Sequence, residues 1–212
     1  MLFNDQPGVS NLVTLTTSVS PNSFTNNSSV NNFTITGTGR ISGALGLTKQ
    51  GSSMLTLTTT NDFTGPVLVE AGTLRLGASA ALGATNSGTT IASGATLDVG
   101  AGNLAANVIN LGFESVTVSG SGVGGNGAIL NSHTNSQQNA LRFVTLAGDT
   151  TFGGPGNWNA VNNPGRWDIR SQAGNTDIAS AANAFLSTGG QPFKLTKTGS
   201  NYVGRGTCIM VV

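Results

Sequence analysis

The residues that could carry acid–base or nucleophilic chemistry are few. His133 is the only histidine, with Ser132 beside it and Ser136 close by. A hydrolytic triad needs a serine held against the imidazole. Neither serine lies in a G-x-S-x-G turn, which is the usual way an α/β-hydrolase exposes its nucleophile. We therefore interpret His133 as a solvent-exposed loop residue rather than as a catalytic base.

The carboxylates are spread along the whole chain. They are Asp5, Asp62, Glu70, Asp98, Glu114, Asp149, Asp168 and Asp177. Enzymes that cleave glycosidic bonds need converging carboxylates. Asp98 and Glu114 are 16 positions apart, and Asp149 and Asp168 are 19 apart, so stacking of either pair on adjacent turns of a repeat stays open. We favour solvated acids at the corners of the fold and expect no catalytic residue.

The cluster RWDIR, from Arg166 to Arg170, combines an aromatic ring, two guanidinium groups and an acid. It leaves two interpretations. Trp167 could form a platform that contacts carbohydrate, with Asp149 or Asp168 lining the same site. Alternatively, the segment is an amphipathic strand with an arginine–aspartate pair, which we favour.

A metal site is not indicated, because metal ligands must cluster and the single histidine lies far from the single cysteine, Cys208. One cysteine also excludes an internal disulfide. We interpret Cys208, in the segment TCIMVV, as a small apolar side chain rather than a reactive thiol. No cofactor is expected.

The composition points to a folded, turn-rich chain with little charge. Of the 212 residues only 8% are charged, 31 are glycine and the net charge is +1. Scattered basic residues argue against nucleic acid as a partner. The segment MLFNDQPGVS is not a signal peptide, and no apolar run approaches a membrane helix. The chain is then either not exported by that route, or a mature form or a fragment of a longer protein.

Short alternating runs predict β-strands almost everywhere, for example FTITG, MLTL, TLRL and ATLDV. They recur with a period near 20: Ile35 to Leu57 is 22 positions, Leu57 to Leu74 is 17, Leu74 to Leu97 is 23 and Leu97 to Val116 is 19. This spacing predicts an all-β parallel β-helix, a β-solenoid, of about ten coils with loop excursions.

Three segments break the rhythm. Residues 1–118 are expected to form one β-helical part, residues 119–140 a Gly-rich and polar loop, and residues 141–212 a continued solenoid. A larger excursion is expected within 151–171. The segment 177–190 could form one or two helical turns before its glycines end them.

Threonine-rich strands raise one further option, because regular threonine arrays on a flat solenoid face can order water or bind ice. The runs TLTT, TITGT and TLTTT do not recur at one position in every coil of the expected pattern. We therefore disfavour ice binding.

One stretch carries a family resemblance: LTKQGSSMLTLTTTNDFTGPVLVEAGTLRLGASAALG, residues 47–83. Its elements are the opening Leu-Thr-Lys with a following glycine, the Leu-Thr-Leu strand, the Asn-x-Phe-Thr-Gly corner, a valine strand, Ala-Gly-Thr-Leu and the closing Ala-Leu-Gly. This order resembles the autotransporter-associated beta-strand repeat, also called the passenger-associated transport repeat. Pro66 and Met54 depart from the pattern. LTKTGSN, residues 195–201, resembles the start of a second copy.

The resemblance implies a right-handed parallel β-helix in the exported passenger of a large bacterial surface protein, with a structural or adhesive role and no catalytic residues. The expected location is extracellular or at the cell surface. The expected partners are other copies, stacked end to end through edges such as Ile209 to Val212, or surface and matrix glycans. The alternative function is a polysaccharide-binding or polysaccharide-degrading β-helix.

Overall fold

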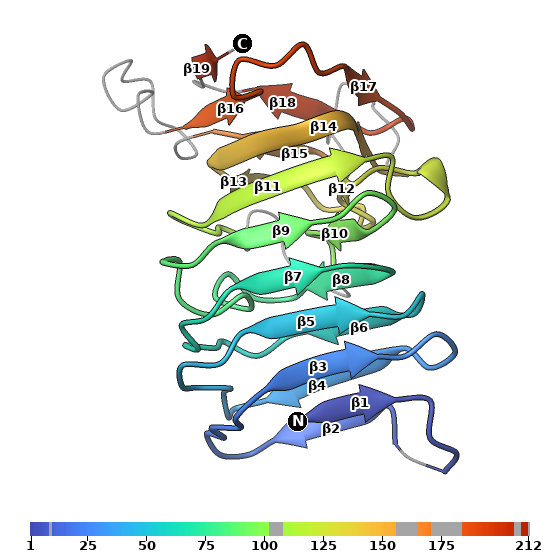
Figure 1. Cartoon of the computed structure of the whole chain (residues 1–212), viewed down its shortest axis with the longest axis vertical. Helices are drawn as coiled ribbons and strands as arrows, with labels where there is room; N and C mark the ends of the chain where they lie inside the picture. Colours follow the sequence, from blue (N-terminus) through green and yellow to red (C-terminus); the bar gives the residue numbers. More distant parts are fainter. Residues whose placement is uncertain (9, 102–107, 156–164, 171–183, 206–208, 212) are drawn as a thin grey trace.

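The chain winds into a right-handed parallel β-helix (Figure 1). The computed structural model describes residues 1–8, 10–101, 108–155, 165–170, 184–205 and 209–211. In Figure 1 the near strands run left to right, the far strands run right to left, and the chain climbs with each coil. The predicted all-β solenoid is confirmed. Each coil pairs in parallel with the one below and the one above.

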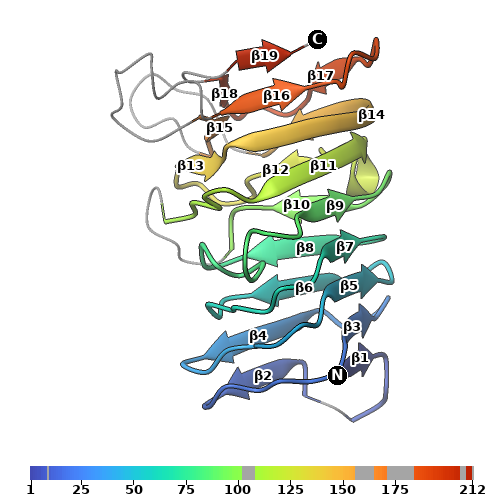
Figure 2. The same cartoon turned by 60° about the vertical axis from the view of Figure 1, so that its left-hand side comes forward.

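Within the described residues, the first face of the solenoid is a ladder of nine parallel levels. From the N-terminal end its strands are β1 (Leu2–Asn4), β3 (Phe24–Asn27), β5 (Leu47–Gln50), β7 (Val67–Val69), β9 (Thr89–Ile91), β11 (Ser115–Gly120), the first half of β14 (Phe143–Gly153), β16 (Phe185–Ser187) and β19 (Ile209–Val211). Figure 2 shows the same ladder after a turn of the molecule.

The second face is built in the same way. Its strands are β2 (Leu12–Leu15), β4 (Phe33–Gly37), β6 (Met54–Leu57), β8 (Thr73–Leu76), β10 (Thr96–Asp98), β12 (Ile129–Leu130), the second half of β14 and β17 (Leu195–Lys197). Strand β14 turns the corner between the faces, because its Val144 pairs with Val116 on the first face and its Phe152 with Ile129 on the second. A small third sheet holds β13 (Gln137–Leu141), β15 (Trp167–Ile169) and β18 (Val203–Arg205).

The core is a column of inward-facing apolar side chains. Leu55 and Leu57 of β6 lie under Leu74 and Leu76 of β8, and all four are fully buried. Burial of each such side chain stabilises the fold by roughly 1.5–3 kcal/mol. The alternation seen in the sequence therefore places one apolar set inward on both faces.

Part of the predicted register is confirmed and part is wrong. Ile35 pairs with Leu57 and Leu74 pairs with Leu97, as their spacing indicated. Leu97, however, pairs with Ile129, while Val116 lies on the other face. Both faces carry the same apolar alternation, so spacing alone could not tell which strand stacks on which.

Residues 119–140 are not one loop. This interval contains the end of β11, a short 3₁₀ turn η1 (Val123–Gly125), all of β12 and the start of β13. Of the segment 177–190, the part up to residue 183 lies outside the described residues, and Phe185–Ser187 is a strand instead of helix. Leu186 there is buried in register with Val144, so packing onto the coil below decides the conformation.

Threonines align on several coils of the first face but, as the sequence indicated, not on every coil. An outward column runs through Thr25, Thr48, Leu68, Thr90, Thr117 and Thr145 on successive coils. Leu68 interrupts it, and the positions two residues on in β3 and β5 hold Asn27 and Gln50. One broken column is not the double threonine array that would order a lattice of water.

Candidate functional site

A groove of about 430 Å³ runs along the second face. Its floor is formed by outward side chains of β6, β8, β10 and β12, and its walls by the segment around η1 and by the turns at Gly154–Pro155 and Thr198–Gly199. Thr96 fixes one wall, because its hydroxyl donates to the Gly127 carbonyl at 3.0 Å and accepts from the Val123 amide at 2.9 Å. These two hydrogen bonds hold the wall around η1 against the floor of the groove.

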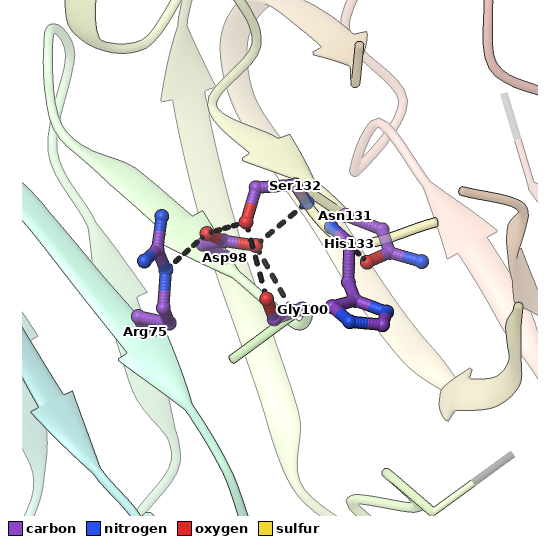
Figure 3. Close-up of polar contacts among 6 residues, drawn as sticks. All are labelled: Arg75, Asp98, Gly100, Asn131, Ser132 and His133. Carbon is purple, nitrogen blue, oxygen red and sulfur yellow. Dashed lines mark hydrogen bonds and ion pairs between the residues drawn. The ribbon is translucent and has the colours of Figure 1, made fainter. Parts of the chain in front are cut away.

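Asp98 lines this groove and is 1% exposed. Figure 3 shows its carboxylate among Arg75, Gly100 and Ser132. Its carboxylate accepts hydrogen bonds from Arg75 Nε at 2.7 Å, from the Gly100 amide at 2.9 Å, and from the amide and hydroxyl of Ser132 at 3.0 and 2.6 Å. Both carboxylate oxygens are thus occupied by donors from three coils. The expectation of a solvated corner acid is wrong here, because the 131–133 turn covers the carboxylate.

Gly100 is what allows that turn to close. A Cβ atom at this position would lie 2.1 Å from Asn131 Oδ1 and 2.6 Å from the His133 amide nitrogen. These contacts are too short for any side chain, and the Asn131 oxygen is itself held by the His133 amide at 3.0 Å. The glycine is required by this close approach and not by its backbone angles.

His133 and Ser132 do not form a nucleophile–base pair. The Ser132 hydroxyl donates to Asp98, while His133 Nδ1 accepts from the Asn135 amide at 2.9 Å and stabilises the turn. His133 is half-buried rather than exposed. Its imidazole therefore stabilises the turn in which it lies.

The two suggested carboxylate pairs are not brought together. Asp98 ends β10 on the second face, whereas Glu114 directly precedes β11 on the first. Asp149 belongs to β14 and is exposed, and Asp168 belongs to β15 in the third sheet. The Asp149 carboxylate accepts a hydrogen bond from the Lys194 backbone amide at 2.8 Å, so it holds the backbone at Lys194 in place.

Glu114 is buried with incomplete partners. Its side chain is 3% exposed, Oε1 accepts the Thr89 hydroxyl at 2.6 Å, and Oε2 has no hydrogen-bond partner in the described part of the chain. Burial raises the pKa of this carboxyl above its usual value, and the Thr89 bond only partly offsets the effect.

The remaining described acids lie at exposed corners, as expected. Asp5 accepts the amides of Ser29, Val30 and Asn31 at 2.7, 3.1 and 3.0 Å and the Ser28 hydroxyl. These hydrogen bonds, that of Ser28 foremost, hold the pKa of Asp5 well below its usual range. Asp62 pairs with Arg40 at 3.3 Å, and Glu70 accepts from Gln50 at 2.8 Å.

Trp167 is a core residue and not a surface platform. Its side chain is 0% exposed, its Nε1 donates to the Gly153 carbonyl at 3.1 Å, and its ring meets Phe152 edge-on at 5.1 Å. Asp168 beside it is also fully buried and is bound by Arg166 through Nε at 2.7 Å and Nη2 at 2.5 Å. The arginine–aspartate pair predicted for this segment is present, but the strand is not amphipathic, because all three residues of β15 are buried.

Lys49 has a structural role that sequence reasoning did not assign. Its side chain is 0% exposed, and Nζ donates to the carbonyls of Gln50 at 2.6 Å, Gly51 at 2.8 Å and Ala71 at 3.3 Å. Ala71 belongs to the next coil, so the ammonium joins two coils. Burial lowers the pKa of Lys49 to about 8. The sequence signal for this role was the second Leu-Thr-Lys, at residues 195–197. There Lys197 likewise donates hydrogen bonds to the carbonyls of the two residues that follow it, at 2.5 and 2.9 Å.

Asn61 joins three coils at the opposite corner of the same stretch. Its Oδ1 accepts the Ile41 amide of the coil below at 3.0 Å, and its Nδ2 donates to the Ala81 carbonyl of the coil above at 2.8 Å. Asn61 is 3% exposed. Lys49 and Asn61, two polar residues of the stretch 47–83, therefore link neighbouring coils from buried positions.

Two predicted positions, Asp177 and Cys208, lie outside the described residues. Within the described ranges, no three of histidine, cysteine, aspartate and glutamate gather as a metal site would require. No helix in that part of the chain is long and apolar enough to cross a membrane.

Comparison with known proteins identifies a repeat within the stretch 47–83. The model of the passenger-associated transport repeat matches residues 47–76. The chain is 40% identical, over 84 residues, to the adhesin BmaC autotransporter of Brucella suis biovar 1 (strain 1330). That alignment covers 40% of this chain and 2% of the relative, so the chain spans a very small part of the relative's length. No solved structure matches significantly. The chain thus contains a passenger-associated transport repeat, at residues 47–76.

Proposed function

We propose that this chain is a structural and adhesive β-helical segment of a bacterial protein exported to the cell surface or beyond. One observation carries the proposal. In the repeat, the buried side chains of Lys49 and Asn61 link neighbouring coils by hydrogen bonds, and links of this kind suit a stack of coils that forms a rod. The similarity to an autotransporter adhesin supports both the location and the role.

The proposed role is non-enzymatic. It is supported by the engagement of Asp98, Asp168 and Ser132 in buried hydrogen bonds that fix the fold. Incubation with a panel of neutral and acidic polysaccharides should release no product. Turnover that disappears in Asp98→Asn would contradict this part of the proposal.

The adhesive role is tested by display on the surface of a non-adherent bacterium. Cells that present the chain should bind glycan-coated surfaces better than cells that present an unrelated β-helix. Equal binding by the two strains, with equal amounts of protein displayed, would overturn adhesion.

End-to-end assembly is the second part of the proposal. Strands β1 and β2 each pair on one side only within the described residues, and Leu2 and Leu12 on them are 63% and 58% exposed. Such strand edges tend to accept another strand. Sedimentation should show concentration-dependent oligomers of the chain, and the double variant Leu2→Lys, Leu12→Lys should be monomeric. Oligomers that persist unchanged in this variant would contradict stacking through this end.

A polysaccharide-binding function is the candidate favoured by the groove on the second face. Thr96 holds one wall of the groove in place, and Arg75 is part of its lining.

A further inference from the structure

We propose that the groove over β6, β8, β10 and β12 binds a carboxylate-bearing saccharide, and that Arg75 holds the carboxylate. The inference rests on the proposed adhesive function and names the site and the ligand class. Three observations carry it: the Arg75 guanidinium is held in place by Asp98, Asp98 itself is buried, and the groove is lined by both apolar and polar side chains.

The guanidinium of Arg75 is oriented from one side only. Its Nε donates to Asp98 at 2.7 Å, and Asp98 is in turn immobilised by Ser132 and Gly100. Neither Nη atom of Arg75 has a hydrogen-bond partner among the described residues, and the side chain is 28% exposed. Two parallel N–H donors therefore remain for an oxygen pair, the geometry in which arginine binds carboxylates in a bidentate manner.

The acid that lines the groove has little accessible surface, and donors from the chain already occupy both of its oxygens. Asp98 is 1% exposed and its oxygens already accept four hydrogen bonds. Among the described residues that line the groove, Arg75 and Asp98 are the only charged ones. The groove thus presents the two remaining N–H donors of the Arg75 guanidinium. A carboxylate complements them better than a hydroxyl group does, because only the carboxylate forms two charge-assisted hydrogen bonds.

The lining also matches the two-sided character of a sugar ring. Met54, Leu130 and Pro155 supply apolar surface, while Thr73 and Asn126 supply hydroxyl and amide groups. A pyranose has an apolar C–H face and a polar rim. A volume of about 430 Å³ lies within the usual range for small-ligand sites, roughly 300–1,000 Å³.

The test compares a trimer of α-1,4-linked galacturonic acid with its methyl ester, which keeps the rings and removes the charge. Each is titrated into the isotopically labelled chain, and amide shifts are followed by NMR. The acid should shift the amides of Thr73, Thr96 and Asn126, with at least about 10-fold higher affinity than the ester. This ratio is what one lost charge-assisted contact produces, about 1.4 kcal/mol.

Variants separate the groove from the rest of the fold. Arg75→Gln should weaken binding of the acid about 10-fold or more, whereas Arg40→Gln, in an exposed pair on another corner, should leave it unchanged. Thr73→Trp fills the groove without removing the Arg75–Asp98 bond and should abolish binding even if Arg75→Gln folds poorly.

Three outcomes would overturn the assignment: equal affinity for acid and ester, shifts confined to another face, or full binding by Thr73→Trp. Preference for an acidic peptide over the acid trimer would overturn it as well. Absence of binding by a folded chain removes this site but leaves the adhesive function standing, because cell adhesion is measured separately.

Discussion

At the scale of single residues, several polar side chains hold neighbouring coils together through hydrogen bonds. Lys49 and Asn61 bridge coils, and Asp98 locks Arg75 beneath a turn. These groups are removed from water, so each must find partners or carry a cost. Burial lowers the pKa of Lys49 and raises the pKa of Glu114, because the uncharged form of each group is favoured away from water.

Lys49 should make stability rise with pH above 8. Its folded pKa of about 8 lies below the usual 10.5, so the native state bears the full cost of the buried ammonium below pH 8. That cost is relieved as the pH rises from 8 to 10.5, by about 2 kcal/mol in favour of folding. Urea unfolding across this range should show the rise in the wild type. Lys49→Met should largely remove it, and an identical pH profile in that variant would refute the explanation.

Glu114→Gln should stabilise the protein near neutral pH by about 1 kcal/mol, since it removes a buried charge with a single donor. The raised pKa of Glu114 means that stability is highest below its ordinary value of 4.5 and is lost as pH rises through the folded value. Thermal unfolding at pH 7 and pH 4 should therefore show a gain only at pH 7. Glu70→Gln, at an exposed corner, is the matched control and should be neutral at both.

At the scale of elements, each strand is short and depends on the corner that precedes it. The corner between β7 and β8 brings Gly72 against Gly51, Ser53 and Lys49 of the coil below. The chain can pass there only without a side chain. Strand alternation then places Leu74 and Leu76 inward, so a corner glycine sets the register of the strand after it.

Gly72→Ala should destabilise the protein by about 3 kcal/mol. Its φ of 68° is unfavourable for alanine, and the new Cβ would lie 2.3 Å from the Ser53 carbonyl oxygen and 2.8 Å from Lys49 Nζ. Gly94→Ala is the matched control: its φ is 87°, but nothing lies within 4 Å of the Cβ position. That change should cost only about 1 kcal/mol. Equal midpoints in urea for both variants would show that the close approach has no consequence.

At the scale of the whole molecule, stability is built coil by coil. Each coil contacts mainly its neighbours, as in other solenoids, so local strength follows local packing. Thr48 pairs with Leu68, 20 positions later, but Thr145 pairs with Ser187, 42 positions later. A longer closed segment costs more chain entropy, and the C-terminal coils also bury less, as Leu195 shows at 38% exposure.

Hydrogen exchange should therefore be graded along the rod. Amides of β5 to β8 should be the most protected, and those of β16 to β18 should exchange faster through local opening. Mass spectrometry of the exchanged, digested chain measures this directly. Uniform protection over both sets would mean that the molecule opens only as one unit.

The sequence by itself determined the fold class, because period-two alternation leaves an apolar face on every strand and a recurrence near 20 stacks those faces. It also predicted the repeat through Leu-Thr-Lys and the corner glycines, and the arginine–aspartate pair of β15. It could not determine which coil Leu97 rests on, nor that Trp167 is buried, since both faces carry the same pattern and excursions change the coil length. The groove with Arg75 and Asp98 was decided only by tertiary structure: its parts come from β6 through β17, and only stacking of coils brings residues so distant in sequence to one surface.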